Sequence, residues 1–151
     1  MPAMNAPDSE PLGYLLHRVA ATLRPELVGV LTPLGLGLPE FVCLRIISLN
    51  PGLTSAGLAR LTNVSAQATN QLLHRLEAAG AVRRPDAAAA GKALPAELTA
   101  TGRTLLARAE DAVHVADQRV LDRLTPTEQR QLKALLRKAG QGDTSCGPVD
   151  S

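Results

Sequence analysis

The chain has 151 residues, of which 45% are hydrophobic and only 1% aromatic, so it has the size of one compact unit with a core of leucine, valine, isoleucine and alanine. Two cysteines are too few for a disulfide framework, and no unbroken apolar run is long enough to cross a bilayer; we therefore expect a cytoplasmic protein with no membrane partner. The net charge of +2 is too small to indicate or exclude nucleic acid by itself.

The N-terminal part is expected to be a disordered arm over residues 1–9, followed by a dimerisation helix over residues 10–34. Apolar residues recur in the helix at steps of three and four, which predicts one apolar face. They are Leu12, Leu15, Leu16, Val19 and Leu23. We expect Pro25 to kink or divide this helix, because proline lacks the backbone amide hydrogen that a helix interior uses.

The next two helices are short. The first is expected over residues 39–49, because Pro39 suits the first turn of a helix and Asn50-Pro51-Gly52 stops it. The second is capped by Thr54 or Ser55 and has Leu61 among its buried residues. Asn63 suits the turn after it.

A fourth helix is expected between Ser65, its cap, and Gly80, its stop. Its apolar face is Ala68, Leu72, Leu73 and Leu76. The other face carries amide, imidazole and guanidinium groups, which can reach base edges or phosphates if the helix lies in a major groove. Its members are Gln67, Asn70, Gln71, His74 and Arg75. The segment from Arg60 to Lys92 contains five basic and two acidic residues, so positive charge is concentrated in this region.

Two short strands, within 81–85 and 94–98, are expected to pair as an antiparallel wing with residues 86–93 at its tip. Pro95 removes a hydrogen-bond donor, so only an edge position accepts it. A long helix then starts at Thr99, and Thr125-Pro126-Thr127-Glu128 predicts the cap of a last helix. We expect residues 140–151 to form a disordered tail.

The predicted fold is mainly α with a small β-wing, in the order α-α-α-α-β-β-α-α. A winged helix-turn-helix over residues 38–98 stands between the N-terminal dimerisation helix and the C-terminal dimerisation helices of residues 99–139. Amphipathic helices in so thin a bundle leave apolar stripes uncovered, which favours a homodimer.

This order resembles the multiple-antibiotic-resistance-regulator (MarR) family of bacterial transcription factors, over nearly all of residues 10–140. The segments that carry the resemblance are Leu38-Pro39-Glu40-Phe41, Leu58-Ala59-Arg60, residues 64–84 and Leu98-Thr99-Ala100-Thr101-Gly102. It implies a homodimer with interleaved terminal helices, which places two recognition helices in successive major grooves of a pseudo-palindromic double-stranded DNA operator. It also implies a repressor released by a small aromatic acid, such as a salicylate-like compound.

Two sets of site residues follow. The expected DNA-binding residues are Ser65, Gln67, Ala68, Asn70, Gln71, His74, Arg75, Arg84 and Lys92. Lys92 stands where family wings usually carry arginine, and lysine lacks the planar fork that suits a narrow groove. Asp86 is expected to hold Arg84. The expected effector-binding residues are Tyr14, His17, Arg18 and Cys43.

Each set has a plainer alternative. The polar helix face is otherwise an ordinary solvated surface, and Tyr14, His17 and Arg18 are otherwise a polar cluster in a dimer interface. Cys43 is either an oxidant sensor or an inert thiol in apolar surroundings. The rival function is a winged-helix dimerisation module that does not bind DNA. The sequence offers no catalytic motif, no cofactor and no metal-ligand spacing.

Overall fold

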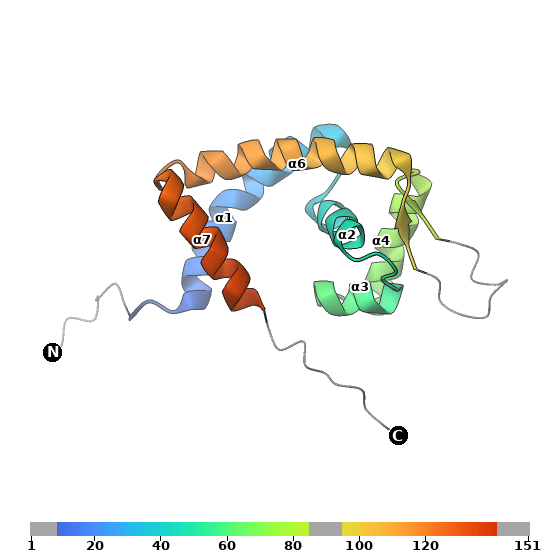
Figure 1. Ribbon diagram of the computed structural model, residues 1–151, viewed down its shortest axis with the longest axis horizontal. Helices are drawn as coiled ribbons and strands as arrows, with labels where there is room; N and C mark the ends of the chain where they lie inside the picture. The colour runs from blue at the N-terminus through green and yellow to red at the C-terminus, as the bar shows by residue number, and fades with distance from the viewer. Residues whose placement is uncertain (1–8, 85–94, 142–151) are drawn as a thin grey trace, which may run out of the picture.

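The computed structural model describes residues 9–84 and 95–141 (Figure 1). The expected wing tip, including Asp86 and Lys92, lies outside these ranges, as do most of the expected N-terminal arm and C-terminal tail. The elements in chain order are α1 (Leu12–Leu31), the 3-10 turn η2 (Thr32–Leu34), α2 (Leu38–Leu49), α3 (Ser55–Thr62), α4 (Ala66–Ala78), β1 (Val82–Arg83), β2 (Glu97–Leu98), α6 (Ala100–Leu121) and α7 (Pro126–Gly140). The predicted mainly helical fold with a small wing is confirmed.

The long helix α6 runs the length of the molecule and joins its two ends (Figure 1). It packs along α1 and, nearer its own start, against α2. Helices α2, α3 and α4 and the two-stranded sheet form a lobe at the start of α6, and α7 follows its other end. The lobe with the recognition helix is therefore built on the first half of α6.

Four helices begin at hydroxyl caps, because a serine or threonine oxygen accepts a hydrogen bond from an amide that the helix leaves unpaired. The caps are Thr54, Ser65, Thr99 and Thr125. At Thr125 the bond is reciprocal, since Glu128 also accepts from the Thr125 amide at 3.0 Å. Thr54, as one of two alternatives, Ser65 and Thr125 were predicted as caps from the sequence, whereas Thr99 was predicted only as the start of its helix. Each cap stabilises its helix by about 1 kcal/mol.

Pro25 does not divide α1, which continues as one helix from Leu12 to Leu31. Both Pro25 and Ala21, whose carbonyl loses its helical donor, lie on the exposed side, where water can take the place of the missing hydrogen bond. Packing along α6 holds the helix on either side of the proline. Of the two expected effects of Pro25, division of the helix was therefore wrong, and a kink stays a prediction.

Leu61 was expected on the buried side of α3 but is 56% exposed. The eight-residue helix is buried only through Gly57 and Leu58, so its last turn is left uncovered. Asn63 then adopts a left-handed conformation with φ 54°, as the predicted tight turn requires.

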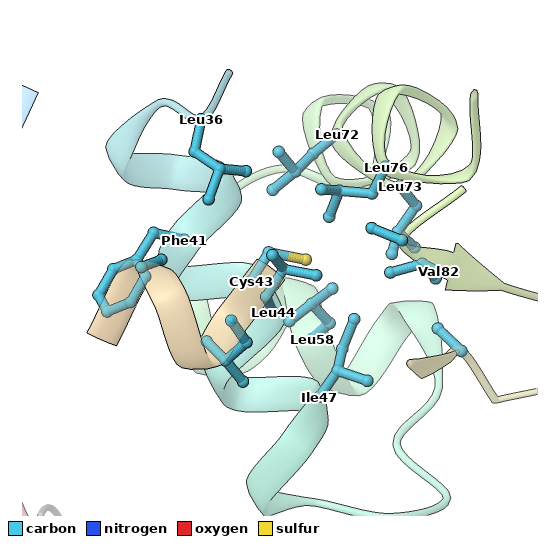
Figure 2. Packing of buried hydrophobic residues seen from close by; sticks show 14 of the residues in the cluster. Leu36, Phe41, Cys43, Leu44, Ile47, Leu58, Leu72, Leu73, Leu76 and Val82 are labelled. Carbon is cyan, nitrogen blue, oxygen red and sulfur yellow. The ribbon is translucent and has the colours of Figure 1, made fainter. Parts of the chain in front are cut away.

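The core of the lobe fixes the orientation of α4 (Figure 2). Leu44 of α2, Leu58 of α3 and Leu73 of α4 are at most 1% exposed and belong to one apolar cluster. Burial of a leucine is worth about 1.5 to 3 kcal/mol, so these side chains hold the buried face of α4 against the lobe. Its opposite face is consequently turned outward.

The wing starts as two strands of two residues, with Val82 opposite Leu98 and Arg83 opposite Glu97. The described strands are shorter than the expected ranges, and Pro95 lies before β2 rather than in it. Close packing supports them: a side chain on Gly102 of α6 would overlap the Ala81 carbonyl. Thr99 adds a hydrogen bond from its amide to that carbonyl at 3.0 Å.

Within the described ranges, no single helix is long and apolar enough to cross a membrane. Together, Leu12–Leu34 and Leu38–Leu49 are long and apolar enough for a membrane span, but the chain bends by 78° between them. The apolar composition of α2 is accounted for by the core of the lobe, to which it contributes four buried residues.

Candidate nucleic-acid interface and ligand cavity

The recognition helix α4 has one buried and one exposed face. Its buried residues are Thr69, Leu72, Leu73 and Leu76. Its exposed residues include the five polar side chains of this helix that were predicted to reach DNA, namely Gln67, Asn70, Gln71, His74 and Arg75. Ala68 is half-buried between the two faces. The structure therefore brings the predicted polar residues together on one open surface.

The N-terminus of α4 is exposed as well. Ser65 caps it through a hydrogen bond that its hydroxyl accepts from the Ala68 amide at 3.2 Å. The remaining amides of a helix's first turn carry partial positive charge and suit an anion such as a phosphate. Ser65 thus has the cap role that the sequence predicted, and its phosphate contact stays a prediction.

The predicted DNA-binding set contains two arginines, Arg75 and Arg84, and each of them pairs with a carboxylate. Arg75 donates from Nε to Glu40 Oε1 of α2 at 3.1 Å, and Arg84 forms an ion pair with Glu77 at the end of α4. The partner predicted for Arg84, Asp86, lies outside the described residues. Glu40 and Glu77 were not predicted as partners, because Glu40 is 35 residues from Arg75 and Arg84 lies beyond the end of α4, where helical spacing does not apply.

A cavity of about 550 Å³ lies between α1 and the start of α2. Its walls are mostly apolar, and its titratable members are His17 and Arg24. These two residues are seven apart on α1 and therefore share a face of the helix. An apolar cleft with one or two cationic groups suits a small aromatic carboxylate.

The predicted effector residues are only partly gathered at this cavity. His17 lines it, whereas Tyr14 and Arg18 form a separate pair, with the Arg18 guanidinium 5.9 Å from the centre of the Tyr14 ring. Arg24 was missed, although its seven-residue spacing from His17 was a signal that could have found it.

Cys43 does not line the cavity but packs in the core of the lobe, with no exposed surface (Figure 2). Burial, with a smaller contribution from the charge of Glu40, raises the pKa of its thiol from 9.0 to about 12. A thiol in this state is a poor nucleophile. The geometry therefore gives no support to an effector contact for Cys43 and favours the inert alternative over the oxidant sensor.

Histidine, cysteine and carboxylate side chains do not gather in groups of three or more that could hold a metal ion, as far as residues 9–84 and 95–141 are concerned.

Comparison with known proteins agrees with this geometry. The family model described as "MarR family" matches residues 34–93, which contain the whole helix-turn-helix. The HTH-type transcriptional repressor Rv2887 of Mycobacterium tuberculosis is 57% identical over 137 residues, which are 91% of this chain and 99% of the relative. The chain belongs to the MarR family.

Two solved structures of a MarR-family protein are similar over most of the chain. The crystal structure of Mycobacterium tuberculosis Rv2887 in complex with DNA has a TM-score of 0.76 and 57% identity, over 87% of this chain and 99% of that one. The complex of the same protein with salicylic acid has a TM-score of 0.73 and 57% identity, over 89% and 100% of the two chains. The MarR-family resemblance predicted from the sequence is thus confirmed.

Proposed function

We propose that this MarR-family chain is a DNA-binding transcriptional repressor that acts as a homodimer and leaves its operator when a small aromatic acid binds. The observation that carries the proposal is the exposed polar face of α4, which the core of the lobe turns outward. The relative Rv2887, which is named a transcriptional repressor and whose structure was solved with DNA, supports the same reading.

The side chains on α4 fit base and phosphate recognition. Asn and Gln amides can pair bidentately with adenine, and arginine with guanine or phosphate. Gln67, Asn70 and Gln71 supply the amides, and Arg75 supplies the guanidinium. The rival dimerisation module would instead bury this face or make it acidic, and it is exposed with no acidic residue in its first turn.

A second copy of the chain is the proposed partner of α1 and α7. The first eight residues of α1 are all exposed in one protomer, although Leu12, Leu15, Leu16 and Val19 are apolar. No residue of α7 is buried, and Leu135 and Leu136 are exposed. Large apolar side chains left uncovered in such number favour an interaction site on these helices. We therefore propose that residues 10–34 and 99–139 act as dimerisation segments, with residues 38–98 as the DNA-binding unit.

The ligand is proposed to be a salicylate-like acid in the cavity between α1 and α2. Arg24 gives it a cationic group and His17 an imidazole, and the rest of the wall is apolar. Support comes from Rv2887, which was crystallised with salicylic acid and with p-aminosalicylic acid. Occupancy would favour a spacing of the two recognition helices that no longer fits successive major grooves, and a coupling of about 1 to 3 kcal/mol suffices for such a switch.

The test is DNA binding by fluorescence anisotropy. A footprint on the DNA upstream of the protein's own gene supplies the operator, and a random duplex of equal length serves as the control at low and high salt. We expect operator affinity to exceed random-duplex affinity roughly a thousandfold or more, and to fall when salicylate is added. Equal weak binding to both duplexes would favour the dimerisation module. An unchanged affinity and melting temperature with salicylate would overturn the effector part alone.

A further inference from the structure

Glu40 lies in the first turn of α2, between the ligand cavity and the recognition helix. Leu38, two residues earlier in the same turn, is part of the cavity wall. On the other side, Glu40 Oε1 accepts the hydrogen bond from Arg75 Nε at 3.1 Å. One turn of helix therefore touches both the cavity and the DNA-facing side of α4.

The Glu40 carboxylate lies close against the backbone of Gly37. This glycine is the N-cap of α2, and a side chain there would overlap the second carboxylate oxygen, Oε2. The carboxylate thus folds back over the N-terminus of its own helix, where the helix dipole favours negative charge. Only 18% of the Glu40 side chain is exposed, so it has little freedom to leave this position.

The Arg75 guanidinium is hydrogen-bonded only through Nε, the nitrogen nearest the aliphatic part of the side chain, as far as the described residues are concerned. The hydrogen bond to Glu40 uses Nε, and within the described residues the two terminal nitrogens, Nη1 and Nη2, make no hydrogen bond. The side chain remains 58% exposed. Because the guanidinium is planar, fixing Nε also fixes the direction of the terminal nitrogens that would contact DNA.

Resting on the proposed function, we propose that Glu40 is a positioning residue that carries occupancy of the cavity to Arg75. With the first turn of α2 in its present place, Glu40 aims Arg75 at the operator. An aromatic acid that pushes against Leu38 displaces the same turn, and a shift of about 1 Å lengthens the contact with Nε beyond hydrogen-bond range. Arg75 then loses its fixed direction, and operator binding weakens more than random-duplex binding.

Two variants break the link in different ways. Glu40→Gln removes the charge with little change of shape, and Gly37→Ala keeps the charge but displaces the carboxylate. Gly37 has φ −91°, which alanine adopts without strain, and the overlapping atom is the end of a flexible side chain, so the fold should tolerate the change. Glu110→Gln, which removes the carboxylate that pairs with Arg45, and Gly140→Ala, where an added Cβ meets nothing within 4 Å, are the matched controls.

The readout is the salicylate response, defined as the ratio of the operator Kd with saturating salicylate to the operator Kd without it. In the wild-type protein we expect this ratio to lie in the range typical of allosteric coupling, roughly 5- to 150-fold. We expect Glu40→Gln and Gly37→Ala to lower the ratio by a factor of about three or more. The Kd of salicylate for the free protein and the melting temperature should stay at wild-type values. Both controls should keep the wild-type ratio. A merely structural role of Glu40 would move the melting temperature and leave the ratio unchanged.

A double-mutant cycle with Arg75→Gln assigns the effect to the pair. Arg75→Gln alone should lower the salicylate response as Glu40→Gln does, and the double variant should lower it no further. Additive losses, or a wild-type response in both Glu40→Gln and Gly37→Ala, would overturn the link while leaving the proposed function intact. A wild-type protein without any salicylate response would instead overturn the effector part of the proposed function and this link with it.

Discussion

At the scale of single residues, Thr69 is the one buried polar side chain on the recognition helix. It is 1% exposed, and its hydroxyl has no hydrogen-bond partner within the described residues. An unpaired buried hydroxyl costs about 1 to 3 kcal/mol. We therefore expect Thr69→Val, which keeps the shape and removes the hydroxyl, to raise the free energy of unfolding by about 1 kcal/mol. Urea denaturation followed by circular dichroism measures this change.

The matched control is Thr104→Val on α6. Thr104 is exposed, and its hydroxyl donates to the Ala100 carbonyl at 3.1 Å, so its removal relieves no buried unpaired group. We expect this variant to be neutral or slightly destabilised. If Thr69→Val were destabilised to the same degree as Thr104→Val, the hydroxyl of Thr69 must have a partner in solution.

Cys43 gives a second residue-scale prediction, on pH dependence. Its pKa is raised to about 12 in the folded protein against 9.0 in the unfolded chain, so the folded state holds the proton more tightly. The stability that this contributes is complete below pH 9.0 and is lost as the pH rises from there towards 12. In a Cys146→Ser background, we expect a disulfide reagent to leave Cys43 unmodified at pH 8 and to modify it once urea unfolds the chain. Rapid modification in the folded state would contradict this burial.

At the scale of secondary structure elements, the contact between α6 and Ala81, the residue before β1, depends on Gly102. An added Cβ there would overlap the Ala81 carbonyl, which is backbone and cannot move aside as a flexible side chain can. We expect Gly102→Ala to lower the free energy of unfolding by about 3 kcal/mol, at the upper end of overpacking. Without this overlap, alanine in place of glycine in a helix interior would raise the free energy of unfolding. The sign of the measured change therefore shows whether the overlap is present.

Gly29→Ala on α1 provides the comparison, because nothing lies within 4 Å of the added Cβ. Glycine in a helix interior costs about 1 kcal/mol relative to alanine, so this variant should be more stable. Chemical denaturation of both variants, under one set of conditions, separates the steric effect at Gly102 from the propensity effect. Equal gains in the two variants would mean that α6 and the wing are not in close contact.

Features that depend on near neighbours in the chain could be predicted from the sequence. The caps at Ser65 and Thr125, and the left-handed Asn63, are set by the residues around them. Features that need residues distant in sequence could not. The pairing of Arg75 with Glu40 joins residues 35 apart, and the continuity of α1 through Pro25 relies on α6.

The candidate site follows the same division. Helical spacing alone was enough to place the polar side chains of α4 on one face, because that face is the complement of the leucine stripe. The cavity was harder, since it is formed where α1 meets α2. Of the predicted effector residues, His17 lines the cavity. Arg24 also lines it and was not predicted, whereas Cys43 packs in the core. Their contact with an effector stays a prediction.

At the scale of the whole molecule, a single protomer leaves the apolar face of α1 uncovered. Leu16 is 45% exposed and Val19 49% exposed, on the helix that also carries the cavity wall. If a second copy covers this face, two charges placed there should separate the protomers. We expect Leu16→Glu combined with Val19→Glu to raise the dimer dissociation constant at least about a hundredfold, or roughly 2.7 kcal/mol. Sedimentation velocity over a range of protein concentrations measures the shift.

Leu49→Glu is the control, because Leu49 is 65% exposed but lies at the end of α2, in the DNA-binding lobe. It should leave the dissociation constant unchanged.

Loss of the dimer should also weaken DNA binding, because a monomer contacts only one half-site and lacks the second recognition helix. The variant with both Leu16→Glu and Val19→Glu is therefore expected to keep its random-duplex affinity per protomer, while its operator affinity at nanomolar protein falls at least about a hundredfold. A dimer that survives the two glutamates would place the protomer contact on another surface, and the recognition helices would then need a different geometry to meet successive grooves.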